Sequence, residues 1–209
     1  MKTSSILLLA LGTLPALHLV TGTVATPAAP ATTPTAFGAE ARTYTIDSVH
    51  SAVLFRAPHL DLSAAWGRFN KFEGELVFSE DASACSVKVS IDPASVDSAS
   101  EARDEHLRGQ DFLNVAQFPR ASFASSEVEF REGGQLRITG ELELHGVKKE
   151  VTFDAVLLGE GDRGERFGQR IGFEGSLTID RREFGITTYP NEAIGDSIRL
   201  VLAFEGAGK

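Results

Sequence analysis

Cysteine is almost absent from this sequence, and its scarcity limits how the fold can be stabilised. Cys85 is the only cysteine among 209 residues, so the chain cannot form an internal disulfide. Its stability must come from side-chain packing and from the hydrogen bonds of secondary structure. Nothing near Cys85 would lower the pKa of its thiol, so we expect a core or edge residue rather than a reactive nucleophile.

Positive charge is also scarce. The chain has 20 Lys and Arg against 29 Asp and Glu, which gives a formal net charge of −9 at pH 7. Nucleic-acid binding needs a basic surface, so the composition argues against a nucleic-acid partner. It also argues against attachment to an anionic membrane by charge alone. An acidic surface is typical of a protein that stays dispersed in solution.

Motifs of catalysis and metal binding are missing as well. The sequence has no G-x-S-x-G elbow, no H-E-x-x-H pair and no P-loop. The one G-x-G-x-x-G match, at residues 159–164, is followed by a strand pattern instead of the helix that a dinucleotide site requires. We therefore predict no catalytic residue, no metal and no cofactor, although ligands from separate strands could still meet in space. No i,i+4 pair exists among His50, His59, His106 and His145.

Long apolar runs are confined to the beginning of the chain. Lys2, the apolar run from Ile6 to Leu11 and the small residues up to Ala25 predict a secretory signal peptide over residues 1–25. Residues 26–39 are mainly Ala, Thr and Pro without charge, which predicts a flexible tether. Residues 40–209 then form one domain, and the protein is expected to be periplasmic or secreted.

A period of two residues dominates the rest of the sequence. Leu136, Ile138, Leu142 and Leu144 alternate with polar residues, which is typical of a strand with one wet face. The apolar phase shifts near Ser126, which predicts a β-bulge. Eight or nine such strands with short turns, such as His145-Gly146, favour an all-β fold, an eight-stranded antiparallel barrel. The segments lie near Tyr44 and at 53–57, 72–78, 87–91, 121–130, 136–144, 151–157, 171–179 and 198–204.

Helical signals are few, and we predict one or two short helices. Ser98 and Glu101 have the spacing of a capping box before a helix over residues 101–108, which Gly109 can end. Residues 60–66 could form a second helical turn. On the first helix, Asp104 and Arg108 stand at i and i+4, so we expect them to pair on a solvated face.

Five blocks of the sequence, spread over residues 43–205, together resemble the YceI-like family of polyisoprenoid-binding exported proteins. Their order and spacing are specific, although each block alone is weak. Glu143 departs from the Thr-rich hairpin pattern of the family, and Arg108-Gly109-Gln110 replace small polar residues. The blocks are Tyr44-Thr45-Ile46-Asp47 with His50-Ser51 and Phe55, residues 67–74, residues 103–107 with 111–113 and Phe118-Pro119, residues 140–147, and residues 182–186 with 194–196.

The resemblance implies a lipocalin-like barrel with an apolar tunnel that holds a polyisoprenoid, such as the tail of an isoprenoid quinone. Periodicity alone favours a filled core of phenylalanines, and the resemblance reverses that preference. It implies transient contact with a membrane or membrane protein, and it leaves a homodimer open. The expected tunnel residues are Phe55, Phe72, Phe78, Leu142, Phe153 and Phe173, with Phe112, Phe118, Phe184 and Ile186 closing one end and His50, Arg103 and His106 near a head group.

Three alternatives compete with a lipid carrier. The chain could be a stress-related protein-interaction module whose core is filled and holds no ligand. An enzyme acting on an isoprenoid is disfavoured by the missing nucleophile, base and metal motifs. An electron-transfer role would be a variant of the carrier, and it would need a redox-active ligand.

Overall fold

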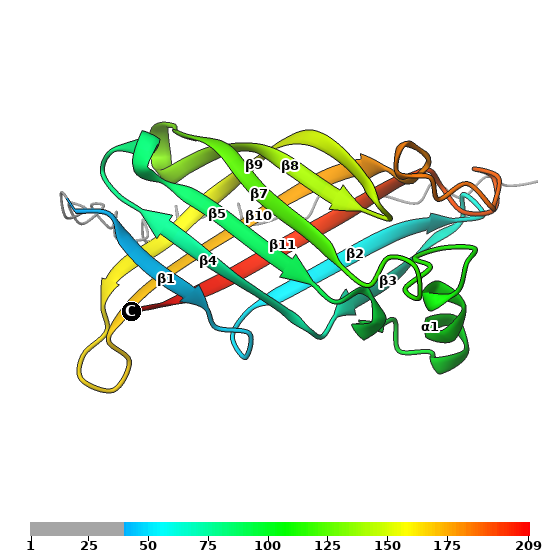
Figure 1. Cartoon of the computed structure of the whole chain (residues 1–209), viewed down its shortest axis with the longest axis horizontal. Helices are drawn as coiled ribbons and strands as arrows, with labels where there is room; N and C mark the ends of the chain where they lie inside the picture. Colours follow the sequence, from blue (N-terminus) through cyan, green and yellow to red (C-terminus); the bar gives the residue numbers. More distant parts are fainter. Residues whose placement is uncertain (1–39) are drawn as a thin grey trace, which may run out of the picture. The chain divides into compact units, whose positions relative to one another are not determined.

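The alternating segments form the strands that their period predicts. The computed structural model describes residues 40–209, so the predicted signal peptide (1–25) and tether (26–39) lie outside the described residues. Within this described part of the chain, eleven strands form one antiparallel sheet (Figure 1). They are β1 (Arg42–Ile46), β2 (Ala52–His59), β3 (Ser63–Phe69), β4 (Phe72–Phe78), β5 (Ser86–Ile91), β6 (Val96–Asp97), β7 (Ala121–Phe130), β8 (Gln135–Leu144), β9 (Val147–Asp162), β10 (Gln169–Asp180) and β11 (Ser197–Gly208).

This sheet closes into the predicted eight-stranded barrel because β11 pairs with both β1 and β2. Tyr44 of β1 lies opposite Gly208, and Val53 of β2 lies opposite Leu202. The strands β1 and β2 thus run along two halves of the same neighbour. In the same way, β4 pairs with β1 while β3 pairs with β2, so β3 and β4 together occupy one strand position of the barrel wall. The next position is shared by β5, which pairs with β4, and β6, which pairs with β3. Closure by β11 joins the two ends of the sheet, as the strand pattern favoured, although residues 63–67 of β3 pair only with β2.

The predicted turns and bulge are confirmed. His145 and Gly146 join β8 to β9 with φ values of 54° and 74°, which suit a two-residue hairpin. The register of β7 against β8 shifts between Ser125 and Glu127, at the expected bulge. The glycine-rich segment at residues 159–164 lies in the β9–β10 hairpin, where no helix follows it.

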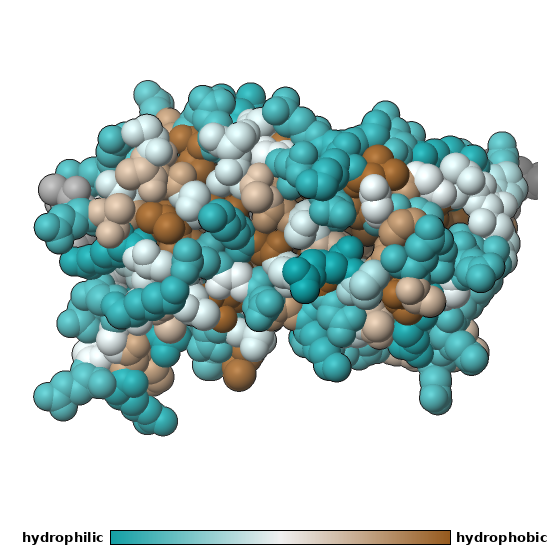
Figure 2. Space-filling view, viewed as in Figure 1, coloured by the Kyte–Doolittle hydropathy of each residue, from teal (hydrophilic) through white to brown (hydrophobic). Residues whose placement is uncertain are grey.

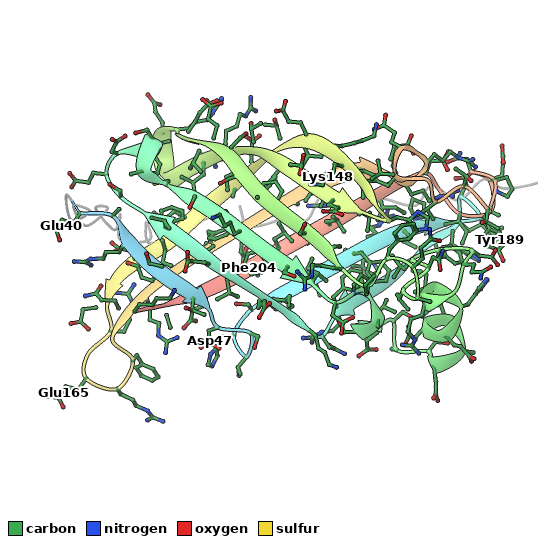
Figure 3. The ribbon with its side chains drawn as sticks, viewed as in Figure 1. Glu40, Asp47, Lys148, Glu165, Tyr189 and Phe204 are labelled. Carbon is green, nitrogen blue, oxygen red and sulfur yellow. The ribbon has the colours of Figure 1, made fainter. Side chains whose placement is uncertain are left out.

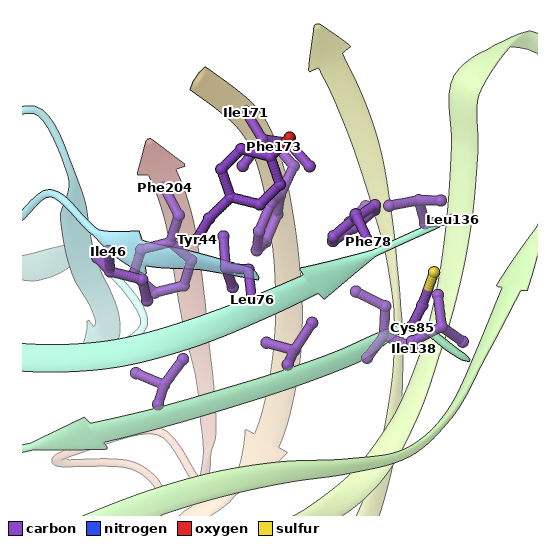
Figure 4. Packing of buried hydrophobic residues seen from close by; sticks show 14 of the residues in the cluster. Tyr44, Ile46, Leu76, Phe78, Cys85, Leu136, Ile138, Ile171, Phe173 and Phe204 are labelled. Atoms are coloured by element: carbon purple, nitrogen blue, oxygen red, sulfur yellow. The ribbon is translucent and has the colours of Figure 1, made fainter. Parts of the chain in front are cut away.

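One half of the barrel interior is filled by interlocking apolar side chains (Figure 4). Tyr44, Leu76, Leu136 and Ile138 are each at most 1% exposed within it. Cys85 is buried in the same cluster, where burial raises the pKa of its thiol. The interpretation of Cys85 as a core residue is confirmed. The face of the molecule shown in Figure 2 is mostly hydrophilic, with small scattered apolar patches.

The single α-helix among residues 40–209, α1 (Glu101–Arg108), has the predicted bounds and ends at Gly109, but its predicted cap and ion pair are wrong. Its N-cap is Ser100, which makes no capping hydrogen bond. Asp104 is only 8% exposed and accepts a hydrogen bond from the backbone N–H of Ser98 at 2.8 Å. The Asp104 carboxylate therefore anchors the helix to the preceding segment, and it is turned away from Arg108.

The second helical turn predicted at residues 60–66 does not form. Leu60 and Asp61 have φ values of 52° and 53°, and they make the tip of the β2–β3 hairpin. From Ser63 the chain pairs along β2 over the whole length of β3, because this pairing satisfies the backbone groups that face β2. Among residues 40–209, no helix has the length and apolar character needed to cross a membrane. Short 3₁₀ turns lie at η1 (Ala82–Ala84), η2 (Pro93–Ser95), η3 (Glu132–Gly134) and η4 (Arg181–Phe184).

Candidate functional site

The second half of the barrel interior is hollow. A cavity of about 470 Å³ lies there, and its wall consists almost entirely of aliphatic and aromatic side chains. Such a size and lining are typical of a site for an apolar small molecule. The wall is formed by every second residue of the strands, the residue that faces inward. Examples are Leu142 and Leu144 of β8, Leu177 and Ile179 of β10 and Leu200 of β11.

The cavity opens where the strands stop pairing. The pairing of β5 with β7 reaches Ile91 and Ala121, and β6 pairs only with β3. The chain between β6 and β7 holds α1, and this segment lies at the same end of the barrel as the β2–β3 hairpin (Figure 1). Leu107 of α1 and Leu113 after it line the cavity. A helix and a loop thus cover this end in place of sheet.

A glycine makes room for one aromatic wall residue. Phe55 of β2 lies opposite Gly67 of β3, and a Cβ atom on Gly67 would stand 2.3 Å from the Phe55 ring. The ring also packs on Phe69 with a centroid distance of 5.7 Å. Only glycine at position 67 lets the Phe55 side chain lie across β3 and line the cavity.

Three phenylalanines form the floor of the cavity, where the hollow half meets the packed half. Phe153, Phe173 and Phe204 line the cavity and also belong to the packed cluster. Phe173 meets Phe204 edge to face at 5.5 Å, and on its other side it contacts Phe78 at 6.5 Å. The cavity is therefore blind at this end.

Aromatic and polar side chains gather at the opposite end, which we call the mouth. Phe112 and Tyr189 stack with ring centroids 5.3 Å apart, and His106 meets the Phe112 ring edge-on at 5.0 Å. The Tyr189 hydroxyl lies 3.2 Å from Nε2 of His106, which is 3.3 Å from the Asp111 carboxylate. Arg103 also lines the mouth, where its guanidinium donates to Oγ of Ser98 at 2.7 Å. The mouth therefore presents hydrogen-bonding atoms that could contact a polar group of a ligand.

Arg181 holds the β10–β11 loop over the mouth. Its side chain is 3% exposed, and burial lowers the pKa of its guanidinium. It donates to the carbonyl oxygens of Ile186 at 2.7 Å, Tyr189 at 2.6 Å and Ile194 at 2.8 Å. It also pairs with the Asp196 carboxylate at 2.8 Å. Arg182, which is more exposed, also donates to the Tyr189 carbonyl oxygen at 2.8 Å, so two arginines hold the loop that carries Tyr189.

The structure brings most of the predicted site residues to this cavity. Two of the three predicted head-group residues, Arg103 and His106, are at the mouth. His50 lies in the β1–β2 loop, where it pairs with Asp47 at 2.9 Å, and it is not among the residues that line the cavity. Figure 3 shows Asp47 far from Tyr189. The predicted apolar residues that line the cavity are Phe55, Phe112, Leu142, Phe153, Phe173 and Ile186.

The other four predicted apolar residues lie outside the cavity wall. Phe72 and Phe78 are in the packed half, where Phe72 contacts Phe204. Phe184 is 1% exposed and packs beside Leu142. Phe118 packs on His145 with tilted ring planes. Their inward phase or their place in a family block could not distinguish a core residue from a cavity residue. Whether any of the ten predicted apolar residues or the three predicted head-group residues contacts a ligand stays a prediction.

Sequence reasoning missed Arg181, Tyr189 and Phe204. Phe204 belongs to the alternating pattern of residues 198–204, and its inward phase was the signal that could have marked it as a cavity residue. Arg181 directly precedes a block that was singled out, residues 182–186. An arginine two residues after the inward-facing Ile179 was a usable signal of burial. Tyr189 had no local signal.

A cluster of acidic residues and a histidine lies in and beside the β1–β2 loop. The ligand atoms of Asp47, His50 and Glu205 are all within 4.8 Å of one another, as a metal site would need. The Arg170 guanidinium, however, contacts Asp47 at 3.0 Å and Glu205 at 3.2 Å. The hydrogen bond from His50, followed by those from the Val49 backbone N–H and from Arg170, lowers the pKa of Asp47 to about 2. An internal cation already serves these carboxylates, so the cluster is explained as an ion-pair network.

Comparison with known proteins gives one family for most of the chain. The model of the YceI-like domain matches residues 44–206. A UPF0312 protein of Pseudomonas aeruginosa is 45% identical over 175 residues, covering 82% of this chain and 90% of the relative. Protein YceI of Salmonella newport is 43% identical over 178 residues, covering 84% of this chain and 90% of the relative.

Solved structures share the fold. BcnA of Burkholderia cenocepacia superimposes with a TM-score of 0.70 at 23% identity, covering 77% of this chain and 98% of BcnA. A YceI protein of Campylobacter jejuni gives 0.66 at 27% identity, covering 73% and 89%. A domain from Saccharophagus degradans, described as polyisoprenoid-binding and implicated in plant cell wall breakdown, gives 0.61 at 15% identity, covering 79% and 98%.

Proposed function

The chain belongs to the YceI-like family, and on that premise we propose that it is an exported binding protein that carries or stores a lipid with an isoprenoid tail. The tail would lie in the hollow half of the barrel, with the polar head at the mouth. The protein would act by binding, without a catalytic group of its own. The blind cavity of about 470 Å³ with its apolar wall is the observation that carries this proposal.

The wall chemistry favours a hydrocarbon over a polar ligand. Polar groups line the cavity mainly near the mouth, and Arg181 already donates to four loop carbonyl oxygens. An apolar chain leaves no buried polar group unsatisfied there, whereas a sugar or peptide would. The likeness to a fold described elsewhere as polyisoprenoid-binding supports a prenyl chain as the hydrocarbon.

The expected energetics suit exchange with a membrane. Each CH₂-sized group contributes roughly 0.8 kcal/mol on leaving water, so a five-carbon isoprene unit contributes about 4 kcal/mol gross. Ordering a flexible tail offsets part of this gain. A bilayer offers the same tail a similar apolar environment. The net preference between protein and membrane is then small, and the lipid can pass in either direction.

The β2–β3 hairpin is our proposed contact with an anionic bilayer. Its tip carries Leu60 and Leu62, which are 51% and 86% exposed, while His59 and Ser63 on either side line the cavity. Behind the tip, Arg199, Arg56 and Trp66 form one lateral row of register neighbours on β11, β2 and β3. In an acidic protein, such a basic and aromatic row next to exposed leucines suits anionic head groups.

Native mass spectrometry of protein purified from its own host tests the proposed function, followed by lipid extraction. We expect a stoichiometric adduct whose fragments carry a prenyl series. In Leu200→Glu, a charge enters the cavity wall and the adduct should be lost. Leu158→Glu is the matched control, because Leu158 is 62% exposed, and it should keep the lipid. A chain that stays bare after incubation with prenyl lipids would exclude the carrier and favour the interaction module.

A further inference from the structure

The barrel wall is incomplete along one edge of β3. This strand pairs with β2 over its whole length, but on its other side only its last two residues pair, with β6. Residues 63–67 therefore form an edge to which no further strand is bound. Ser63, Ala64 and Ala65 of this edge line the cavity, and their small side chains fill little of the space beside it.

The gap beside this edge is covered by residues 99–118, which include α1 and which we call the strap. In the described structure, all backbone hydrogen bonds of residues 101–118 go to residues 100–118, so the strap does not join the sheet. Arg103 and Leu107 of α1 line the cavity together with the edge of β3. Figure 1 shows α1 at the barrel end where the β2–β3 hairpin lies. Moving the strap would open the cavity without breaking any strand pairing, so it should need less free energy than opening the sheet.

Both ends of the strap are anchored. At its start the buried Asp104 carboxylate accepts a hydrogen bond from the Ser98 backbone N–H at 2.8 Å, and at its end Phe118 packs on the β8–β9 turn. Between these anchors, Ala99 and Asn114 have φ values of 60° and 43°. Left-handed backbone is unfavourable for residues with a Cβ atom, so these two positions can most readily change conformation. The strap thus has two fixed ends and two points at which it can bend.

The middle of the strap is held by side chains alone. Phe112 stacks on Tyr189 with ring centroids 5.3 Å apart, and the Tyr189 hydroxyl lies 3.2 Å from Nε2 of His106. The Arg108 guanidinium adds two long hydrogen bonds of 3.5 Å to carbonyl oxygens in and next to β6. The loop that carries Tyr189 is itself fixed by two arginines. Tyr189 is therefore a stationary latch for a segment that can move.

We propose that the strap is a lid over a lateral portal, and that the lipid passes between the strap and the edge of β3 while the sheet stays closed. The lid opens when His106 and Phe112 separate from Tyr189. This inference rests on the proposed function and adds to it the route of the lipid. The portal adjoins Leu62 and Trp66, which are 86% and 52% exposed on the hairpin that should face the bilayer. The tail can then move between membrane and barrel with little exposure to water.

The test follows the rates of transfer in both directions. The full chain, loaded with a radiolabelled long-chain prenol, is mixed with phosphatidylcholine vesicles, which are removed by flotation at timed intervals. Uptake from loaded vesicles is followed in the same way. Tyr189→Ala removes the latch and should speed release and uptake by about tenfold each. Loss of a contact with the lipid itself would speed release alone.

A reversible lock provides the opposite change. His106→Cys with Tyr189→Cys, in a chain that also carries Cys85→Ala, places thiols at two rings whose centroids are 5.8 Å apart. A bismaleimide with a cleavable spacer should slow transfer by about tenfold relative to the same protein before cross-linking, and cleavage should restore the rate. Arg42→Cys with Gln169→Cys is the matched control. These side chains meet at 2.9 Å at the opposite end of the barrel, and their cross-link should leave the rate unchanged.

The edge of β3 is tested by adding bulk to it. Ala64→Phe puts a ring into the portal and should slow release and uptake several fold. Ala203→Phe adds the same ring on β11 at a position that does not line the cavity, and it should leave both rates unchanged. Circular dichroism and thermal unfolding check that each variant folds. The lock is applied to folded protein, so it keeps the test open if Tyr189→Ala does not fold.

The outcomes separate the inference from the function on which it rests. If the wild-type chain binds no prenol, the proposed function and the inference both fail. If the lock between positions 106 and 189 leaves the rate unchanged, or if Tyr189→Ala speeds release alone, the inference alone is overturned. Slower transfer under the lock between positions 42 and 169 also overturns it, because the lipid then leaves at the other end. Faster exchange without the latch and slower exchange under its lock support the portal.

Discussion

Phe173 meets Phe204 edge to face across β10 and β11, with ring centroids 5.5 Å apart and planes inclined at 68°. Each ring has packed side chains on one side and the cavity on the other. The pair therefore divides one continuous barrel into a half that stabilises the fold and a half that can bind a ligand. Stability and binding should respond to different substitutions on the same strands.

Two leucine-to-alanine substitutions test this division directly. Leu136→Ala removes a side chain that is 1% exposed in the packed half, and it should lower the free energy of unfolding by about 3–5 kcal/mol. Leu200→Ala removes the same atoms from the cavity wall, where the side chain has fewer neighbours to lose. We expect about 1 kcal/mol there. Urea unfolding with comparable m-values provides the measurement.

The comparison also has a ligand arm. Saturating Leu200→Ala with a prenyl lipid should raise its free energy of unfolding, because the lipid binds only the folded state. Leu136→Ala should retain the wild-type affinity for that lipid. Equal losses of stability at the two positions would contradict a division into packed and hollow halves.

Arg181 is expected to be the strongest polar contributor near the mouth. Arg181→Met removes the donor to four loop carbonyl oxygens and leaves the Asp196 carboxylate without this partner, which should cost about 3–5 kcal/mol. Hydrogen exchange should accelerate over residues 185–196. Arg182→Met is the comparison and should accelerate exchange less, because Arg182 contacts the same carboxylate but donates to one loop carbonyl oxygen, that of Tyr189, from a side chain that is 36% exposed. A loop that exchanges equally fast in both variants would rule out the proposed role of Arg181.

The strands were predictable from sequence, but the hollow half was not. On β8 the pairs Leu136/Ile138 and Leu142/Leu144 have the same period and the same apolar chemistry, yet the first pair is packed and the second lines the cavity. The difference arises on other strands and in α1, which decide what faces each pair. A two-residue period reports which side of a strand is buried, and it carries no information on what fills the space opposite.

Polar contacts with the loops escaped prediction for a related reason. The spacing of Ser98 and Glu101 predicted a capping box for α1, but Ser98 instead donates its backbone N–H to the buried carboxylate of Asp104, six residues further along the chain. Arg181 likewise binds backbone carbonyl oxygens up to 14 residues away, and backbone groups leave no mark on the sequence. Arg103 and His106 were predicted because they belong to one of the family blocks, residues 103–107. The structure adds Tyr189 beside them.

Tyr44 should make the fold sensitive to alkaline pH. Burial, followed by the hydrogen bond to Glu160, raises the pKa of Tyr44 from 10.0 to about 12. The unfolded chain loses this proton near pH 10 and the folded chain only near pH 12. The contribution is therefore complete below pH 10 and declines between pH 10 and 12, by at most about 1.4 kcal/mol per pH unit. Tyr44→Phe should remove that decline, as measured by urea unfolding, whereas Tyr189→Phe should retain it.

The leucines of the β2–β3 hairpin should matter for membrane contact and little for the fold. In Leu60→Ser with Leu62→Ser, each lost side chain should weaken binding to anionic vesicles by about 1 kcal/mol, or roughly tenfold or more together. Vesicle flotation measures the bound fraction, and vesicles without anionic lipid should bind the wild type less because Arg56 and Arg199 then lose their partners. Val49→Ser is the matched control, since Val49 is 83% exposed in the β1–β2 loop, away from the mouth. If Val49→Ser reduces binding as much as the hairpin variant, the contact is general adhesion and the proposed orientation at the membrane is wrong.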